Sequence, residues 1–262
     1  MPKFKAIIFD WAGTVIDFGS FAPMGAFVET FASFGVDTTI ADARKPMGLP
    51  KRAHITQMLA EPHIAERWRT AQGTAPDEAA IDAVYAVFVP RNIEVVTDYC
   101  TLIPGAADCF AWAQARGMKV GSTTGYTRSI MEKVLPLAAE QAFSPENLNC
   151  ADDLPLGRAT PIGMYKCFLD LMVYPASAVI KVDDTEPGIA EGVAAGCITV
   201  GLALSGNEAG LTEKEFLAMD EAQKAPIRER VTAKLVAAGA HYVIDTVADL
   251  PGLIERIEHA QP

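Results

Sequence analysis

Apolar runs and candidate helices alternate regularly over the second part of the sequence. The apolar runs lie at 118–122, 148–150, 178–182, 197–200 and 241–244. The candidate helices are 105–116, 127–139, 161–173, 186–195, 212–238 and 247–258. Strands that are apolar throughout, each followed by a helix, are typical of a parallel sheet with helices on both faces. The alternation therefore predicts an α/β fold with a doubly wound parallel sheet.

One further apolar run, Lys5–Phe9, opens the chain and stops at Asp10. The long region after it carries helical signals and almost no strand signals. Prolines that suit the first turn of a helix stand at positions 23, 50, 62 and 76. A block of helices after a single strand predicts a helical cap domain of residues 19–99, inserted into a core domain of residues 1–18 and 100–262.

Composition narrows the possible partners. The formal net charge of −11 disfavours nucleic acid and anionic membranes. The five cysteines are scattered and odd in number, as expected of reduced core thiols rather than disulfides or a zinc site. Near the N-terminus no apolar run approaches the roughly 20 residues of a membrane span, and no secretory signal is recognisable. We expect a soluble cytoplasmic protein, in which any anionic substrate needs a local cluster of positive charge.

Asp10 stands at the carboxyl end of the first strand, where open α/β sheets place their reacting groups. Taken alone, this aspartate could equally cap the turn that follows. The second core strand ends in Ser122–Gly125, which includes Thr124. Hydroxyls and amides at that point could cap the next helix, bind an anion such as phosphate, or do both.

Two later motifs bring further charges to the same edge of the predicted sheet. Arg158 lies in a turn before a helix, and its planar fork suits phosphoryl oxygens, although a surface arginine would also fit there. The run Val179–Thr185 is a buried strand ending in paired acids, and oxygen ligands at such a place suit Mg²⁺. Asp184 is the first choice as ligand and Asp183 the second, because one of the pair could merely cap the following helix.

These motifs occur in the order typical of the haloacid dehalogenase (HAD) superfamily, which the chain resembles. The nucleophile loop of that superfamily normally reads Asp-x-Asp-x-Thr, whereas here Ala12 replaces the second acid. In phosphatases of the superfamily the second acid protonates the departing alkoxide, and such general-acid help is worth roughly 10²–10⁴-fold. Either the enzyme is impaired, or its leaving group is not oxygen. A carbon leaving group needs an electron sink instead.

Lys51 is a candidate for that sink, because it opens a helix and His54 follows on the same face. A neutral lysine can condense with an aldehyde, and the resulting iminium accepts the electrons of a breaking C–P bond. The lysine pKa must then fall from about 10.4 to about 7, a change worth about 4 kcal/mol. Burial, nearby Arg52 and the positive end of the helix dipole would all lower it. Taken alone, a solvated surface lysine is the more common case.

At this point the whole chain resembles the phosphonoacetaldehyde hydrolase (phosphonatase) family. Besides the motifs above, the matching stretches are Phe21–Pro23, Met47–Lys51, Gly121–Arg128 and Gly206–Leu211. The resemblance implies hydrolysis of phosphonoacetaldehyde to acetaldehyde and phosphate, in the degradation of 2-aminoethylphosphonate. Lys51 would be the Schiff-base lysine and Asp10 the nucleophile.

The same resemblance implies further roles. Mg²⁺ would be held by Asp10, the Ala12 backbone carbonyl and Asp184. Thr124 and Arg158 would grip the phosphoryl oxygens, while the lysine pocket would be lined by His54, Met47 and Tyr126. The family is usually homodimeric through its caps, and the apolar 21–34 helix could form that contact or simply pack inside the subunit. Some members carry a second acid where this chain has Gly188, and Asp183 could substitute for it.

Two other interpretations stay open. A HAD phosphomonoesterase or mutase would share the core, but it should keep an acid where Ala12 stands and has no need of Lys51. A non-catalytic phosphate- or metabolite-binding protein would explain Ala12 as decay. Decay would not, however, preserve Asp10, Thr124, Arg158 and Asp184 together.

Overall fold

The computed structural model describes residues 4–260, so the leading residues 1–3 of the expected core domain and residues 261–262 lie outside it. A six-stranded sheet forms the centre of the molecule, with the strand order β3-β2-β1-β4-β5-β6 and every neighbouring pair parallel. The strands are β1 (Ala6–Phe9), β2 (Lys119–Thr123), β3 (Asn147–Asn149), β4 (Val179–Asp183), β5 (Ile198–Leu202) and β6 (Tyr242–Ile244). The doubly wound parallel sheet predicted from the sequence is confirmed.

Alternate side chains of the strands face opposite layers of helices, because successive residues of a strand point to opposite faces. Ile7 and Phe9 pack in the largest apolar cluster with helices α6 (Ala106–Ala115), α7 (Arg128–Glu140) and α12 (Leu250–His259). Ala6 and Ile8 pack against α8 (Ile162–Leu171) on the other face. Helices α9 (Glu186–Ala194) and α11 (Glu221–Ala237) complete that second layer.

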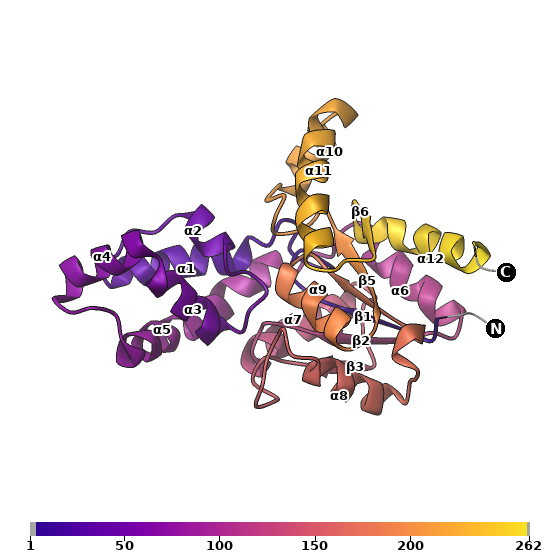
Figure 1. Cartoon of the computed structure of the whole chain (residues 1–262), viewed down its shortest axis with the longest axis horizontal. Coiled ribbons are helices and arrows are strands. Elements are labelled where there is room, and N and C mark those ends of the chain that lie inside the picture. Colours follow the sequence, from indigo (N-terminus) through magenta and orange to yellow (C-terminus); the bar gives the residue numbers. More distant parts are fainter. Residues whose placement is uncertain (1–3, 261–262) are drawn as a thin grey trace.

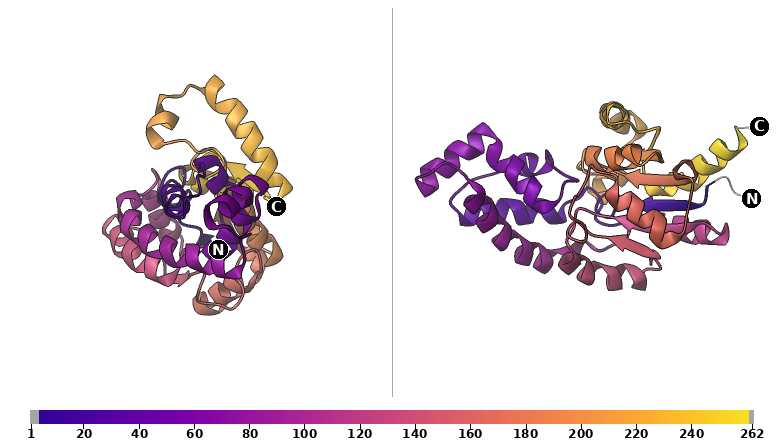
Figure 2. Two further views of the ribbon diagram at one scale, coloured as in Figure 1. Left: turned by 90° about the vertical axis from the view of Figure 1, so that its left-hand side faces the viewer. Right: turned by 60° about the horizontal axis from the view of Figure 1, so that its bottom comes forward.

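A separate group of helices lies beyond the carboxyl ends of the strands, at the left of Figure 1. It comprises α1 (Ala22–Ser33), α2 (Ile40–Arg44), α3 (Lys51–Ala60), α4 (Pro62–Gln72) and α5 (Glu78–Val96). These helices enclose an apolar cluster of their own, in which Phe27, Phe31 and Phe88 are fully buried. The apolar face of α1 is thus largely used inside the subunit. The right-hand view of Figure 2 also shows this group apart from the sheet layers.

Two local differences from the sequence prediction have clear causes. The short helix α2 was not predicted; it begins at a capping box in which Thr39 and Asp42 satisfy each other's backbone amides. The single helix predicted over 212–238 is wrong, because α10 (Glu213–Ala218) ends at Met219 and Asp220 caps a new helix, α11. Three short 3₁₀ segments, Thr97–Tyr99, Ala176–Ala178 and Val247–Asp249, complete the elements. Among the described residues, no helix combines the length and the apolar character needed to cross a bilayer.

Candidate active site

Three buried carboxylates meet where the first and fourth strands end. In the register of the sheet Phe9 lies opposite Val182, so Asp10 and Asp183 follow on neighbouring strands. This point, between β1 and β4, is where the strand order reverses, the usual position of a ligand site in an open α/β sheet. Asp10, Asp183 and Asp184 each offer an oxygen within 4.8 Å of the others. The sheet therefore gathers the three acids that the sequence predicted as nucleophile and metal ligands.

Arg158 lies directly beside Asp10. Its Nη2 is 2.8 Å from Asp10 Oδ1 and also donates to the backbone oxygen of Thr123 at 2.7 Å. Burial, reinforced by Asp183, raises the pKa of Asp10 to about 6, although Arg158 opposes the rise. The pKa of Arg158 itself is raised, since its carboxylate neighbours outweigh the effect of burial. The Asp10 carboxylate is thus buried away from water and paired with the Arg158 guanidinium.

Asp184 is buried next to Asp10 and is fixed from two sides. Thr14 Oγ1 donates to its Oδ1 at 3.1 Å, and the backbone N–H of Asn207 donates to its Oδ2 at 2.7 Å. Burial and the like charges of Asp10 and Asp183 raise the pKa of Asp184 well above its ordinary value. Crowded carboxylates of this kind are stabilised in their charged form by a cation, and an all-oxygen donor set fits Mg²⁺.

Lys51 comes from the other side, as the first residue of α3, and is only 3 % exposed. Its Nζ lies 5.1 Å from the ring centre of Tyr126. Burial lowers the pKa of Lys51 to about 8, with Arg158 adding to the effect while Asp10 opposes it. Arg52, which the sequence suggested as a contributing charge, instead pairs with Glu78 on the outer surface at 2.6 Å.

A pocket connects these groups. Its walls include Asp10, Ala12, Met47, Lys51, Thr124, Tyr126 and Arg158. His54 lies behind this wall, fully buried, with its ring stacked on Phe27 at 4.0 Å between centroids. Burial, together with Lys51, holds the pKa of His54 well below its ordinary value, so the ring is neutral. Asp183 and Asp184 do not line the pocket; both are fully buried beside Asp10.

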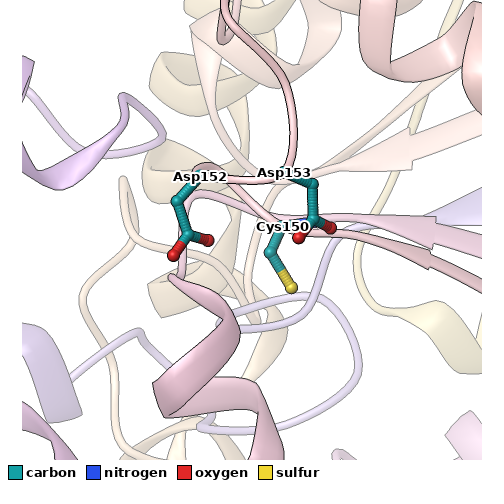
Figure 3. Close-up of side chains that lie close together, drawn as sticks. All are labelled: Cys150, Asp152 and Asp153. Carbon is teal, nitrogen blue, oxygen red and sulfur yellow. The ribbon is translucent and has the colours of Figure 1, made fainter.

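A second group of possible metal ligands, Cys150, Asp152 and Asp153, is shown in Figure 3. Its carboxylates are already engaged by Arg128, whose backbone amide donates to Asp152 at 2.7 Å and whose side chain pairs with Asp153. Burial raises the pKa of the Cys150 thiol to about 12. These residues therefore brace the start of α7, and we do not assign them a metal.

Comparisons with known proteins agree with this arrangement. The family model of haloacid dehalogenase-like hydrolases matches residues 4–196. A phosphonoacetaldehyde hydrolase of Paraburkholderia phytofirmans is 52% identical over 98% of this chain and 97% of its own length. One of Klebsiella pneumoniae is 46% identical over 98% of this chain and 96% of its own. The crystal structure of a phosphonoacetaldehyde hydrolase-like protein from Oleispira antarctica, 42% identical, has a TM-score of 0.96 and covers 98% of this chain and 93% of that one.

This chain belongs to the phosphonoacetaldehyde hydrolase family. It is therefore an enzyme of the hydrolase class, built on the HAD fold. Its glycine at 188, where some members of the phosphonoacetaldehyde hydrolase family carry an acid, has a local explanation. A Cβ atom added to Gly188 would lie 1.9 Å from Asp183 Oδ2, so the Asp183 carboxylate fills the space that a larger residue would need.

Sequence reasoning missed three groups around the site of this phosphonoacetaldehyde hydrolase family member. Lys181 is fully buried on β4, with its Nζ 3.0 Å from Asp183 Oδ2. A charged residue inside an otherwise apolar strand was the signal that could have revealed it. Glu191 lies on α9 and Asp17 before α1, both buried, and nothing in their local sequence distinguishes them from surface acids. Lys181 and Arg158 supply the local positive charge that an anionic substrate requires.

Proposed function

We propose that this enzyme hydrolyses the C–P bond of phosphonoacetaldehyde to acetaldehyde and phosphate, in the degradation of 2-aminoethylphosphonate. One observation carries the proposal: a buried lysine with a lowered pKa faces a carboxylate nucleophile across a pocket that has alanine at position 12. A phosphate ester would need an acid there to protonate its leaving oxygen, and it would have no use for Lys51.

The reaction begins at the lysine. The neutral amine of Lys51 condenses with the aldehyde and releases water, and protonation of the imine gives an iminium. An Asp10 oxygen then attacks phosphorus while the C–P bonding electrons move into the iminium, leaving an enamine on Lys51 and a phosphoryl group on Asp10. Water hydrolyses the aspartyl phosphate. Protonation of the enamine carbon regenerates the iminium, and its hydrolysis releases acetaldehyde and the free amine.

The remaining residues of the pocket bind and orient. Arg158 is fixed beside Asp10, where its guanidinium can pair with the phosphoryl oxygens as they approach. Thr124, directly after β2, offers its hydroxyl, whose oxygen accepts a hydrogen bond from Tyr126 N at 3.1 Å. Met47 and Tyr126 form the walls around the lysine, and neutral His54 keeps that region free of a second cation.

A divalent metal ion belongs to this proposal, and Mg²⁺ suits the donors. Asp10, the Ala12 backbone carbonyl and Asp184 would hold it, with Asp183 as a possible further ligand. Bound there, the ion would offset the negative charge of the nucleophile and of the phosphoryl group. Thr14 and Asn207 already orient the Asp184 carboxylate for such a role.

The organisation of the molecule is part of the same proposal. Residues 19–99 would act as a cap domain that closes on the core, 1–18 and 100–262, and excludes water from the site. We also propose a homodimer formed through the caps and a cytoplasmic location. In support of the latter, Cys100, Cys109, Cys150, Cys167 and Cys197 are all free and buried.

The test is phosphate release from phosphonoacetaldehyde, with and without EDTA, in wild type and in Lys51→Arg. We expect turnover by the wild type that EDTA abolishes, and no turnover by Lys51→Arg, because a guanidinium forms no imine under these conditions. Lys45→Arg is the matched control, since Lys45 is exposed on the same helical domain and pairs with Glu61. Comparable turnover of simple alkyl phosphate esters would instead favour a phosphomonoesterase.

A further inference from the structure

Glu191 has no role in the proposed reaction, yet its carboxylate is buried at the base of the site. It lies on α9, and only 2 % of the residue is exposed. The Thr123 hydroxyl donates to Glu191 Oε2 at 2.7 Å. The same oxygen forms ion pairs with Arg158 Nε at 3.2 Å, outside hydrogen-bond geometry, and with Lys181 Nζ at 3.7 Å. One carboxylate thus contacts both of the cations that neutralise the acids of the site.

Thr123 links the same two cations from the opposite side. Its Oγ1 accepts hydrogen bonds from Lys181 Nζ and from Arg158 Nη2, each at 2.9 Å. The backbone closes tightly around this group: a Cβ atom at Gly163 would lie 2.8 Å from Glu191 Oε1, and one at Gly192 would lie 2.7 Å from Lys181 Cβ. The four side chains therefore have little room to rearrange independently.

Arg158 depends on these contacts for its position. It comes from a loop, 151–160, that has only turns and bends, so no helix or strand fixes its backbone. Its Nη2 faces Asp10 Oδ1 at 2.8 Å and Asp183 Oδ2 at 3.5 Å. Without the charge of Glu191 behind it, the guanidinium would be drawn towards Asp10 and Asp183 at once. It would then enter the space between these two carboxylates, which is where the possible metal ligands meet.

We propose that Glu191 is a positioning residue for the phosphoryl site, which holds Arg158 from behind through Nε so that Nη2 stays on Asp10. Lys181 and Thr123 complete the support. The inference rests on the proposed function only in assigning Arg158 to the phosphoryl group. A buried cluster of this many charges is costly to assemble and could often be replaced by apolar residues without loss of stability. The position of this charged cluster next to Asp10, the proposed nucleophile, accounts for its presence in the core.

A double-mutant cycle on Glu191→Gln and Arg158→Ala tests the inference, with two readouts taken in the presence of Mg²⁺. The first is kcat/KM for phosphonoacetaldehyde, and the second is the affinity for inorganic phosphate by calorimetry. We expect Glu191→Gln alone to lower both by about 10–100-fold, as for other residues that orient a ligand group. In the Arg158→Ala background the same change should add almost nothing, because Glu191 acts through Arg158. Glu186→Gln, on the exposed side of α9, is the matched control.

Additive losses in the cycle, or a Glu191→Gln enzyme that binds phosphate like wild type, would overturn the inference. Should Glu191→Gln fail to fold, as judged by thermal unfolding, Thr123→Val and Thr123→Ser replace it. The serine variant keeps the bridging hydroxyl and is expected to retain phosphate affinity, whereas the valine variant should lose it; equal affinities would contradict the inference. A wild type that binds phosphate but leaves phosphonoacetaldehyde intact would refute the proposed function, while the phosphate-binding cycle would still decide the role of Glu191.

Discussion

At the scale of single residues, the proposed chemistry depends on what surrounds Lys51. A lysine in the first turn of a helix lies at the positive end of the helix dipole, which disfavours its charged form. Burial has the larger effect, because the ammonium ion loses its water. Arg158 adds a like charge, whereas Asp10 and Asp17 favour the ammonium. The balance leaves a substantial neutral fraction of the amine near neutral pH.

This balance predicts the pH dependence of the enzyme. Below its pKa of about 8, Lys51 is protonated and cannot attack the aldehyde, so kcat/KM should fall about tenfold per pH unit on the acid side. Above that pH the profile should level off. The measurement is kcat/KM for phosphonoacetaldehyde between about pH 6 and about pH 9. A profile that is flat across this range, or that rises towards acid, would contradict the assignment of Lys51.

The sequence predicts a site residue when that residue lies in a recognisable local motif. Asp10, Thr124 and Asp184 follow strands and Arg158 precedes a helix, each in a recognisable local motif, so these four residues were predicted to lie at one edge of the sheet. Glu191 has no such motif, because its importance comes only from two cations on distant segments. The position of Arg52 was misjudged for the same reason, since adjacency to Lys51 in sequence put it on the outer face of α3.

At the scale of elements, the segment between β1 and α1 carries the chain from the sheet into the α1–α5 group of helices. The two carboxylate oxygens of Asp17 accept hydrogen bonds from the backbone amides of Phe21 and Ala22, at the start of α1, at 2.9 Å each. Asp17 and Ser20 also adopt φ values of 55°, which L-residues favour only rarely. Burial raises the pKa of Asp17 to about 7, against the opposing effect of these amides.

Asp17→Asn should change how stability depends on pH. The folded protein holds the Asp17 proton up to about pH 7, whereas the unfolded chain releases it near its usual pKa of about 4. The stability contribution of the acid is therefore fully present below about pH 4, declines by about 4 kcal/mol in total as pH rises to about 7, and is lost above that pH. The wild-type minus Asp17→Asn difference in unfolding free energy, from denaturant titrations, should follow that decline. A difference that grows with pH would show that Asp17 is charged in the fold.

Element boundaries followed the sequence where a single strong signal was present. Helices α3 and α4 begin at Pro50 and Pro62, as expected from these prolines. The interval 212–238 was misjudged because Asp220 resembles any other polar residue of an exposed helix. In the structure Asp220 accepts from Gln223 N and its own backbone amide donates to Gln223 Oε1, each at 2.9 Å, and this capping box starts α11.

At the scale of the whole molecule, the pocket exists only where the two groups of helices and strands meet. Met47 and Lys51 come from the α1–α5 group, while Asp10, Thr124 and Arg158 come from loops that follow strands of the sheet. Gly48 permits the close contact, since a Cβ atom there would lie 2.3 Å from Thr185 Oγ1. Neither group holds the complete set of reacting residues.

Arg44, at the end of α2, connects the two groups and reaches towards Asp184. Its Nη1 donates to Gly19 O at 2.7 Å and to Asn207 O at 2.8 Å. The Asn207 amide in turn donates to Asp184. Arg44→Gln should therefore lower kcat/KM by about tenfold or more, since hydrogen bonds to a charged group are worth about 1.5–3 kcal/mol. Arg91→Gln, which breaks an exposed pair with Glu29 inside the helical group, should have little effect on kcat/KM. Equal losses in the two variants would contradict the connection.

The central claim is that Lys51 forms an imine with the substrate, and borohydride trapping tests it most directly. Wild type is incubated with phosphonoacetaldehyde and borohydride, digested, and analysed by mass spectrometry, with Lys51→Arg in parallel. We expect an ethyl or phosphonoethyl adduct on the peptide carrying Lys51, inactivation that requires both reagents, and no adduct at this position in Lys51→Arg. An active enzyme whose Lys51 stays unmodified under these conditions would contradict the mechanism.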